Sequence, residues 1–167
     1  MKNRNSLRRR RPFRSPKPRI LIVCEGTRTE PGYFRAFRHA ERSLVELEIS
    51  PGGVPRTLVQ RAVQLKDTAA KQSRTHADEN LKYDEVWCVF DIDEHPNIQD
   101  ATQQARDNQV EVAISNPCFE LWILLHYQDQ RAHIDRDRLS LECRRHLPDY
   151  EKDVPFETLH ENYLAGC

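Results

Sequence analysis

The sequence predicts an α/β fold in which a small, mostly parallel sheet is flanked by helices. Short apolar segments with the composition of buried strands alternate along the chain with longer segments of helical periodicity. Such alternation is typical of parallel sheets, because their strands are joined by helical crossovers. The 167 residues, 38% of them hydrophobic, suit one domain with a moderate core. We expect this domain over residues 19–167, with a weaker pattern after about residue 128, and a basic, disordered arm over residues 1–18.

The first half of the domain is expected to fold as strand, helix, strand and helix. Residues 19–24 are apolar and rich in β-branched side chains, which predicts a buried strand. Residues 29–43 predict a helix, with Thr29 as its cap. Residues 44–49 alternate apolar and acidic side chains, as in a half-exposed strand. Residues 55–71 carry an apolar stripe at helical spacing, which predicts a second helix.

The second half is expected to continue the alternation after a polar loop at residues 73–84. Asn116 and Pro117 have the N-cap and first-turn preferences of a helix start, which places Glu120 in the first turns of that helix. The expected elements are a strand at 85–90, a helix at 98–108, a strand at 110–114, a helix at 116–127 and a charged helix at 135–146.

The net charge of zero hides two oppositely charged parts of the chain. Residues 1–20 hold nine cations and no acid, which leaves 17 basic residues against 26 acidic ones in the remainder. Basic amino-terminal arms often bind nucleic acid, although a solubilising tail and a partner for the acidic body are alternatives. The predicted phosphate contacts are the four consecutive arginines Arg8, Arg9, Arg10 and Arg11.

Cysteine usage and the absence of long apolar runs indicate a cytoplasmic protein without membrane contact. None of the five cysteines forms a CxxC pair, and Cys24, Cys88 and Cys118 lie in apolar stretches, as expected of core residues in a reducing compartment. No apolar run approaches the ~20 residues that cross a bilayer. The basic amino terminus also lacks the apolar region of a secretory signal.

Acidic residues lie where the chain leaves three of the predicted strands. Glu25 follows the first strand, Asp91 and Asp93 follow the strand at 85–90, and Glu120 comes soon after the last one. The carboxyl ends of parallel strands form one edge, where ligands bind. Unpaired buried carboxylates are costly, but they are stabilised when they share a hard cation such as Mg²⁺. The sequence therefore predicts a metal-dependent phosphoryl-transfer site.

Each of these residues also has an ordinary structural explanation. Glu25 alone is typical of a strand end, and Asp93 of a turn residue that bonds the backbone before Pro96. Glu120 is typical of an acid that compensates a helix dipole. His95 is either a ligand or proton shuttle, or an exposed turn residue. The coincidence of the acids at one predicted edge favours metal binding, and the spacing of the DxD pair lets both carboxylates face one cation.

Three segments resemble the RloB family: 20–34 (ILIVCEGTRTEPGYF), 86–96 (VWCVFDIDEHP) and 113–122 (AISNPCFELW). RloB proteins are small prokaryotic proteins associated with restriction and phage-defence loci, and the NPCFELW block is the most specific part of the match. The family is considered similar to the Toprim domain, a small parallel α/β fold with a glutamate after its first strand and a DxD after a later one. Glu25 matches that glutamate, and Asp91 and Asp93 match the DxD.

The resemblance implies roles for these residues. Asp91 and Asp93 would hold Mg²⁺, with Mn²⁺ as the alternative ion, and Glu25 would act as general acid/base or as a further ligand. Glu120, in the block particular to the family, would complete the site, so that Glu25 and Glu120 are the expected catalytic residues. The accessory candidates are Glu30, His95 and Asn116.

The function expected from the resemblance is that of a Mg²⁺-dependent nuclease subunit in a phage-defence system of the abortive-infection type. It would cleave phosphodiester bonds of DNA or RNA. The usual genomic partner of the family is an ATPase, which implies a companion subunit, and self-association is compatible with the sequence. One alternative is a non-catalytic Toprim-like module that binds nucleic acid or the ATPase. Another is an enzyme that transfers a phosphoryl or nucleotidyl group.

Overall fold

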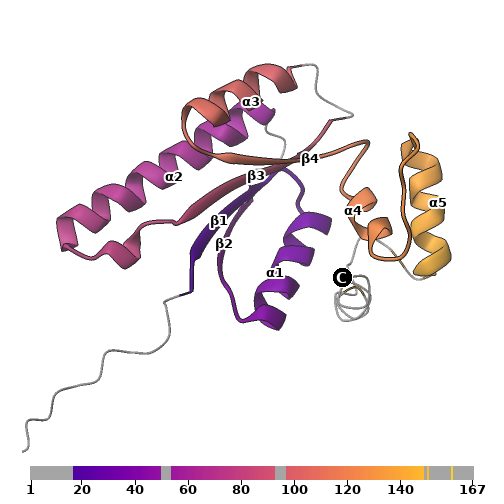
Figure 1. Ribbon diagram of the computed structural model, residues 1–167, viewed down its shortest axis with the longest axis horizontal. Helices are drawn as coiled ribbons and strands as arrows, with labels where there is room; N and C mark the ends of the chain where they lie inside the picture. Colours follow the sequence, from indigo (N-terminus) through magenta and orange to yellow (C-terminus); the bar gives the residue numbers. More distant parts are fainter. Residues whose placement is uncertain (1–16, 50–53, 93–96, 149, 151–158, 160–167) are drawn as a thin grey trace, which may run out of the picture.

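The computed structural model describes residues 17–49, 54–92, 97–148, 150 and 159, and in this part of the chain four strands form one parallel sheet (Figure 1). The predicted arm at residues 1–18 therefore lies almost entirely outside the described residues. The α/β fold expected from the sequence is confirmed, with every strand pair parallel. The strand order is β2-β1-β3-β4, with β1 at Arg19–Cys24, β2 at Leu44–Ile49, β3 at Glu85–Asp91 and β4 at Glu111–Ser115.

Helices cover both faces of this sheet. In Figure 1, α2 and α3 lie on one face, whereas α1, α4 and α5 lie on the other. No helix among the described residues is long and apolar enough to cross a membrane. The helix bounds are Thr29–Glu41 for α1, Pro55–His76 for α2, Ile98–Asp107 for α3, Glu120–Leu125 for α4 and Arg136–His146 for α5, with a short 3₁₀ helix at Glu79–Leu81.

Strand β1 shows why the sheet is buried on both faces. Its side chains alternate, so Leu21 and Val23 pack with the α2 and α3 residues, whereas Ile22 and Cys24 pack on the α1 face. A strand covered on both faces needs a continuous apolar run, which this segment provides. Full burial of one such side chain contributes about 1.5–3 kcal/mol.

The core on the α1 face includes residues from the carboxyl-terminal part of the chain. Tyr33 of α1 packs in one cluster with residues of α4 and α5, and Tyr150 and Leu159 are buried in the same cluster. The weakly patterned region beyond residue 128 therefore contains the predicted charged helix and contributes to the core. The thiols of Cys24, Cys88 and Cys118 are buried and free, as their apolar surroundings in the sequence predicted.

Two predicted helix boundaries were wrong. The expected loop at residues 73–84 instead contains the last turn of α2 and the short 3₁₀ helix, since no glycine or proline interrupts this polar stretch and Ser73 is buried at the helix end. Thr29 is not the cap of α1: it is the first helical residue, and Arg28 occupies the cap position without a side-chain hydrogen bond. The buried position of Thr29 explains why it lies inside the helix.

The start of α4 also differs from the prediction, because Asn116 is not its N-cap. Asn116 is exposed after β4, and Pro117, Cys118 and Phe119 are buried before the helix begins. These three side chains insert into the core, so the chain enters the protein interior as a non-helical segment. Glu120 is consequently the first residue of α4 and does not lie one turn inside it.

Candidate acidic site at the carboxyl edge of the sheet

The two central strands of the sheet are followed by connections that leave in opposite directions. β1 continues through α1 to β2 on one side, and β3 continues through α3 to β4 on the other, with α1 and α3 on opposite faces (Figure 1). Such divergence creates a crevice at the carboxyl ends of the two strands, where ligands bind in open α/β sheets. Glu25 directly follows β1, and Asp91 is the last residue of β3, so both carboxylates flank this point.

Backbone hydrogen bonds fix the positions of these two residues. The Glu25 N–H donates to the Val89 carbonyl at 3.3 Å, which extends the pairing of β1 with β3 by one residue. Asp91 is in register with Ser115, and the next N–H, that of Ile92, donates to the Ser115 carbonyl at 2.9 Å. Hydrogen bonds of the sheet therefore hold the backbone of Glu25 and of Asp91 in place.

Two helices bring further carboxylates to the same edge. Glu30 lies in the first turn of α1 and is buried, with 6% of its surface exposed. Glu120 begins α4, and its charge acts on both Glu30 and Asp91. Glu25 acts on the same two residues. The structure thus brings Glu25, Glu30, Asp91 and Glu120 within electrostatic range of one another.

Asp91 is the most strongly perturbed of the four. Burial raises its pKa to about 7, with further contributions in the same direction from Glu30, Glu120 and, more weakly, Glu25. The Arg136 guanidinium acts in the opposite direction, and its Nη2 lies 4.0 Å from Asp91 Oδ2. The other carboxylate oxygen, Oδ1, is buried without a hydrogen-bond partner among the described residues. Asp91 is therefore only partly compensated by protein groups.

Glu30 is held close to the main chain at the end of β1. Burial raises its pKa, the N–H groups of Glu30 itself and of Gly26 lower it, and Glu120 and Glu25 raise it further. A Cβ atom added at Gly26 would overlap the Glu30 carboxyl group. Glycine is thus needed at position 26 for the close approach of this carboxylate. The sequence indicated only the turn there and left the role of Glu30 open.

The described part of the structure does not place every predicted site residue in this cluster. Asp93 and His95 lie outside the described residues, so their predicted roles stay predictions. Asn116 follows β4 and is exposed, and none of its side-chain contacts connects it to the acids. The roles assigned to Glu25, Asp91 and Glu120 also stay predictions, since their proximity alone does not establish them.

The chemistry of the donor set fits a hard divalent cation. Carboxylate oxygens are the ligands that Mg²⁺ and Mn²⁺ prefer, and a buried oxygen without a partner such as Asp91 Oδ1 is suited to this role. Among the described residues, however, no three His, Cys, Asp or Glu side chains are already grouped tightly enough to hold a metal ion. A complete ligand set would thus require Asp93, a movement of Glu25 or Glu120, or water ligands, of which Mg²⁺ usually keeps several.

Arg136 is the main site residue that the sequence did not reveal. It is the first residue of α5, where the Asp135 side chain caps the helix by accepting a hydrogen bond from the Arg138 N–H at 2.8 Å. The sequence showed a charged helix here, but no pattern connects it with Asp91, which is 45 residues earlier. Only the packing of α5 beside α4 brings the guanidinium to the acidic edge.

An aromatic cluster lies under the same edge, between α1 and α4. The Tyr33 hydroxyl and His126 Nε2 are 3.3 Å apart, and the Tyr33 ring meets those of Phe119 and Trp122 edge-on. His126 is half-buried. The cluster fixes α4 against α1 and thereby fixes the distance between Glu30 and Glu120.

Comparison with known protein families identifies a matching family. The family model of the RloB-like protein matches residues 20–165, which is most of the chain and includes β1 through α5. No curated protein matches the sequence. The matched span contains all four carboxylates of the acidic edge and the Arg136 position. The chain therefore belongs to the RloB family.

Proposed function

We propose that the protein is a Mg²⁺-dependent nuclease that acts in phage defence and cleaves phosphodiester bonds at the acidic edge of the sheet. The observation that carries this proposal is the concentration of four carboxylates at the switch point of the sheet, where burial and mutual repulsion raise the pKa of Asp91 to about 7. An ionisable group with a strongly perturbed pKa in a crevice is a candidate for a functional site. A cation would remove the repulsion.

The proposed roles follow from position and chemistry. Asp91, Asp93 and Glu25 would hold the ion. When bound, Mg²⁺ would stabilise negative charge on the phosphate and lower the pKa of a water molecule. Glu25, half-buried at the crevice, would accept a proton from the attacking water. Glu120 and Glu30 would orient the ligands and the water through hydrogen bonds, and the half-exposed Arg136 side chain would bind a phosphate oxygen.

A non-catalytic module is the competing function, and one observation favours it. Arg136 already provides Asp91 with a cationic neighbour, so the acids have a structural partner within the chain. In that case the protein would bind nucleic acid or a companion ATPase without chemistry. The ATPase partner and the nucleic-acid substrate, DNA or RNA, are both part of our proposal because the family resemblance implies them.

Cleavage assays on the full chain test the proposal. Labelled DNA and structured RNA are incubated with the protein in Mg²⁺, in Mn²⁺ and in EDTA, with and without the companion ATPase. We expect cleavage only with a divalent ion, and a loss of at least about 10²-fold in Asp91→Asn, which keeps the shape but removes the charge. The matched control is Asp107→Asn, an exposed residue at the end of α3. Equal activity of Asp91→Asn and the control would exclude the acidic edge as the site.

A further inference from the structure

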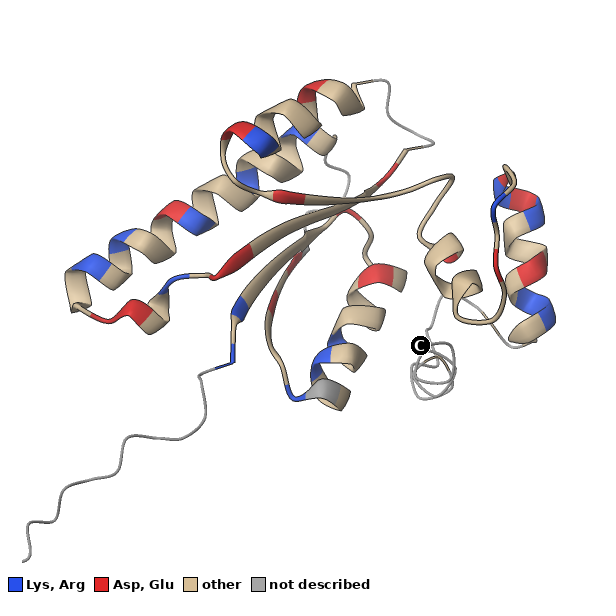
Figure 2. Ribbon diagram, in the orientation of Figure 1, with Lys and Arg blue, Asp and Glu red and all other residues tan. Residues whose placement is uncertain are grey.

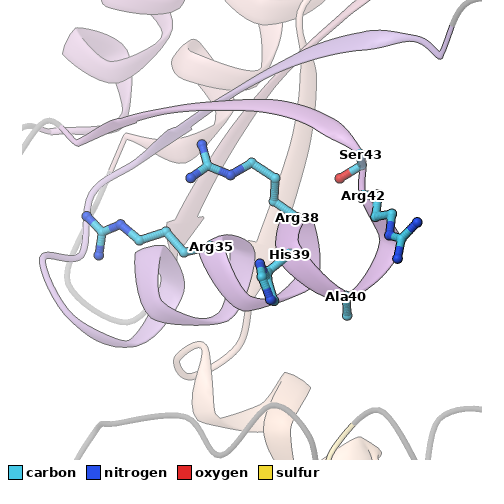
Figure 3. Close-up of a pocket in the computed structure, with 6 residues that line it drawn as sticks. All are labelled: Arg35, Arg38, His39, Ala40, Arg42 and Ser43. Atoms are coloured by element: carbon cyan, nitrogen blue, oxygen red, sulfur yellow. The ribbon is translucent and has the colours of Figure 1, made fainter.

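Four basic residues follow one side of α1 beyond the acidic edge. Arg35, Arg38, His39 and Arg42 are spaced at i, i+3, i+4 and i+7, so they share one face of the helix and its C-cap. We call this set the α1 cationic face. Together with Ala40 and Ser43 it lines an open cavity of about 770 Å³ (Figure 3). Figure 3 shows Arg35 and Arg38 extending in the same direction from neighbouring turns.

Contacts within the protein do not account for these side chains. None of the three guanidinium groups forms an ion pair with a described residue, and no acid is among the described side chains that line the cavity. The hydrogen bond from Arg38 Nη1 to the Val45 carbonyl is long, at 3.4 Å. Cations in the last turn of a helix favour its dipole, which explains Arg38 and His39. This effect does not extend to Arg35, which lies before the last turn.

The cavity also contains an unsatisfied polar group. Ser43 is one of the lining residues, and its Oγ is buried without a hydrogen-bond partner among the described residues. Buried hydroxyl groups without a partner are uncommon, and each one calls for an explanation such as an external ligand. Beside it, Lys17 Nζ donates to the Arg42 carbonyl at 2.7 Å, which adds a fifth basic residue near the cavity. A hydroxyl donor surrounded by cations is suited to an anion with several oxygens.

We propose that the α1 cationic face binds the phosphate backbone of a nucleic-acid strand. Guanidinium groups form bidentate hydrogen bonds with phosphate oxygens, and Ser43 Oγ would donate to another oxygen of the same group. The cations recur at successive turns along a straight helix, which matches a linear polyanion with regularly spaced charges. An acidic protein would present charges at irregular positions and would leave the deep Ser43 hydroxyl unused.

The helix also relates this binding site to the acidic edge. Glu30 and Arg42 are separated by 12 residues, or about 18 Å along the axis. One strand of a duplex advances by about 3.4 Å per phosphate along its axis, so this length corresponds to about five nucleotides. Resting on the proposed function, the inference is that the α1 cationic face holds the substrate a few nucleotides away from the bond to be cleaved.

Binding measurements in EDTA test this inference separately from cleavage. Fluorescence anisotropy with the full chain and labelled strands of about 16 nucleotides gives the affinity between about 50 and 200 mM salt. The test variant combines Arg35→Gln, Arg38→Gln and Arg42→Gln. The matched control removes three exposed arginines from other helices, by Arg74→Gln, Arg106→Gln and Arg144→Gln.

We expect the test variant to lose at least about 10-fold in affinity at low salt, and the slope of log K against log salt to decrease by about 2–3 units, since each lost phosphate contact removes about 0.7–0.9. Ser43→Ala should weaken binding by a few-fold without changing the slope. An affinity and slope equal to those of the control variant would overturn the inference. So would displacement of the labelled strand by polyglutamate as effective as that by unlabelled nucleic acid.

The two proposals fail in different ways. If the acidic edge is not catalytic, cleavage will be absent or will not depend on Asp91, but the loss of binding in the test variant will still support the α1 cationic face. If only the cationic face is wrong, cleavage will depend on Asp91, and the test variant will bind like its control. A small diester such as bis(p-nitrophenyl) phosphate lacks the neighbouring phosphates that the α1 cationic face would bind, so its hydrolysis by an active enzyme should be unaffected by the test variant.

Discussion

The two ends of α1 carry opposite charges in opposite environments. In Figure 2 the acidic end of this helix is directed toward the carboxyl edge of the sheet, and basic residues mark its other end. Glu30 is buried among other carboxylates, whereas Arg35, Arg38 and His39 are exposed. Both signs agree with the helix dipole, which favours acids at the start and cations at the end. The two ends therefore differ in the burial of their charged side chains, and this difference determines which function each end can serve.

Burial of the acidic end lowers the stability of the folded protein, whereas the exposed cationic end has little effect on it. Buried like charges raise one another's pKa and lower the stability of the charged form. Exposed cations are screened by water and salt and contribute about 0–1 kcal/mol each. A buried acidic cluster thus lowers the stability of the fold, and we expect it to serve catalysis. An exposed cationic face costs little stability and is suited to reversible binding. Four predictions test this division.

The largest effect is expected from Glu25→Gln. The amide cannot accept a proton, so cleavage should fall by about 10²–10⁴-fold while binding to nucleic acid in EDTA changes less than about 2-fold. Single-turnover cleavage and anisotropy on the same preparation measure both quantities. The test variant of the α1 cationic face should show the reverse, with weaker binding and an unchanged rate at saturating substrate. A variant at either end that lowers both quantities equally would contradict the division.

A smaller effect is expected on stability as the pH rises. The pKa of Asp91 is about 7 in the folded protein and about 4 in an unfolded chain. Between these two pKa values the folded state binds more protons than the unfolded chain. The contribution of Asp91 to stability should therefore be greatest below about pH 4 and decrease as the pH approaches 7. Other groups also titrate in this range, and a comparison with Asp91→Asn separates their effect from that of Asp91. The unfolding free energy of this variant should depend less on pH than that of the wild-type protein and should be higher at pH 8.

Mg²⁺ should counteract this decrease, because an ion that binds only the folded state stabilises it. Thermal unfolding at pH 8 with and without Mg²⁺ measures the effect, which we expect to be a rise of a few degrees in the wild-type protein and none in Asp91→Asn. At pH 5, where the carboxyl group is largely protonated, Mg²⁺ should have little effect. An equal Mg²⁺ response in both proteins would place the ion elsewhere.

The smallest effect is expected from Gly26→Ala. The added Cβ would occupy the space of the Glu30 carboxyl group, which is the end of a flexible side chain and is able to move away. The fold should therefore persist, with a change in unfolding free energy of about 1 kcal/mol or less. Cleavage should fall by about 10-fold if Glu30 orients the site, and Glu30→Gln should cause a similar loss. Unchanged cleavage in both variants would assign Glu30 a purely structural role.

The sequence predicted the sheet and part of the acidic edge for a physical reason. Buried parallel strands need continuous apolar runs, so residues 19–24 and 85–90 were recognisable, and the acids directly after them were located with their strands. Glu120 was identified by its motif, but its position in the helix was wrong. Asn116 and Pro117 have strong helix-start preferences, which the burial of Cys118 and Phe119 overrode.

Tertiary packing explains what the sequence could not predict. The proximity of Asp91 and Arg136 depends on how α5 packs beside α4, and no local sequence pattern predicts that packing. The α1 cationic face did have a local signal, because Arg35, Arg38 and His39 are spaced at helical intervals and alternate with the apolar Phe34 and Phe37. The cavity beside it could not be inferred, since its lining includes Arg42 and Ser43, where the chain turns away from the helix.

Arg42 has a consequence for protein engineering. It adopts the left-handed conformation, with φ 49° and ψ 38°, where the helix is closed by hydrogen bonds from the Arg42 and Ser43 N–H groups to carbonyls of the last turn. Glycine is preferred at such positions, and a bulkier residue there costs about 1 kcal/mol. Selection for heat tolerance alone would thus enrich glycine at position 42 and remove a cation that we assign to substrate binding. Thermostabilised variants should consequently be screened for nucleic-acid affinity as well as for melting temperature.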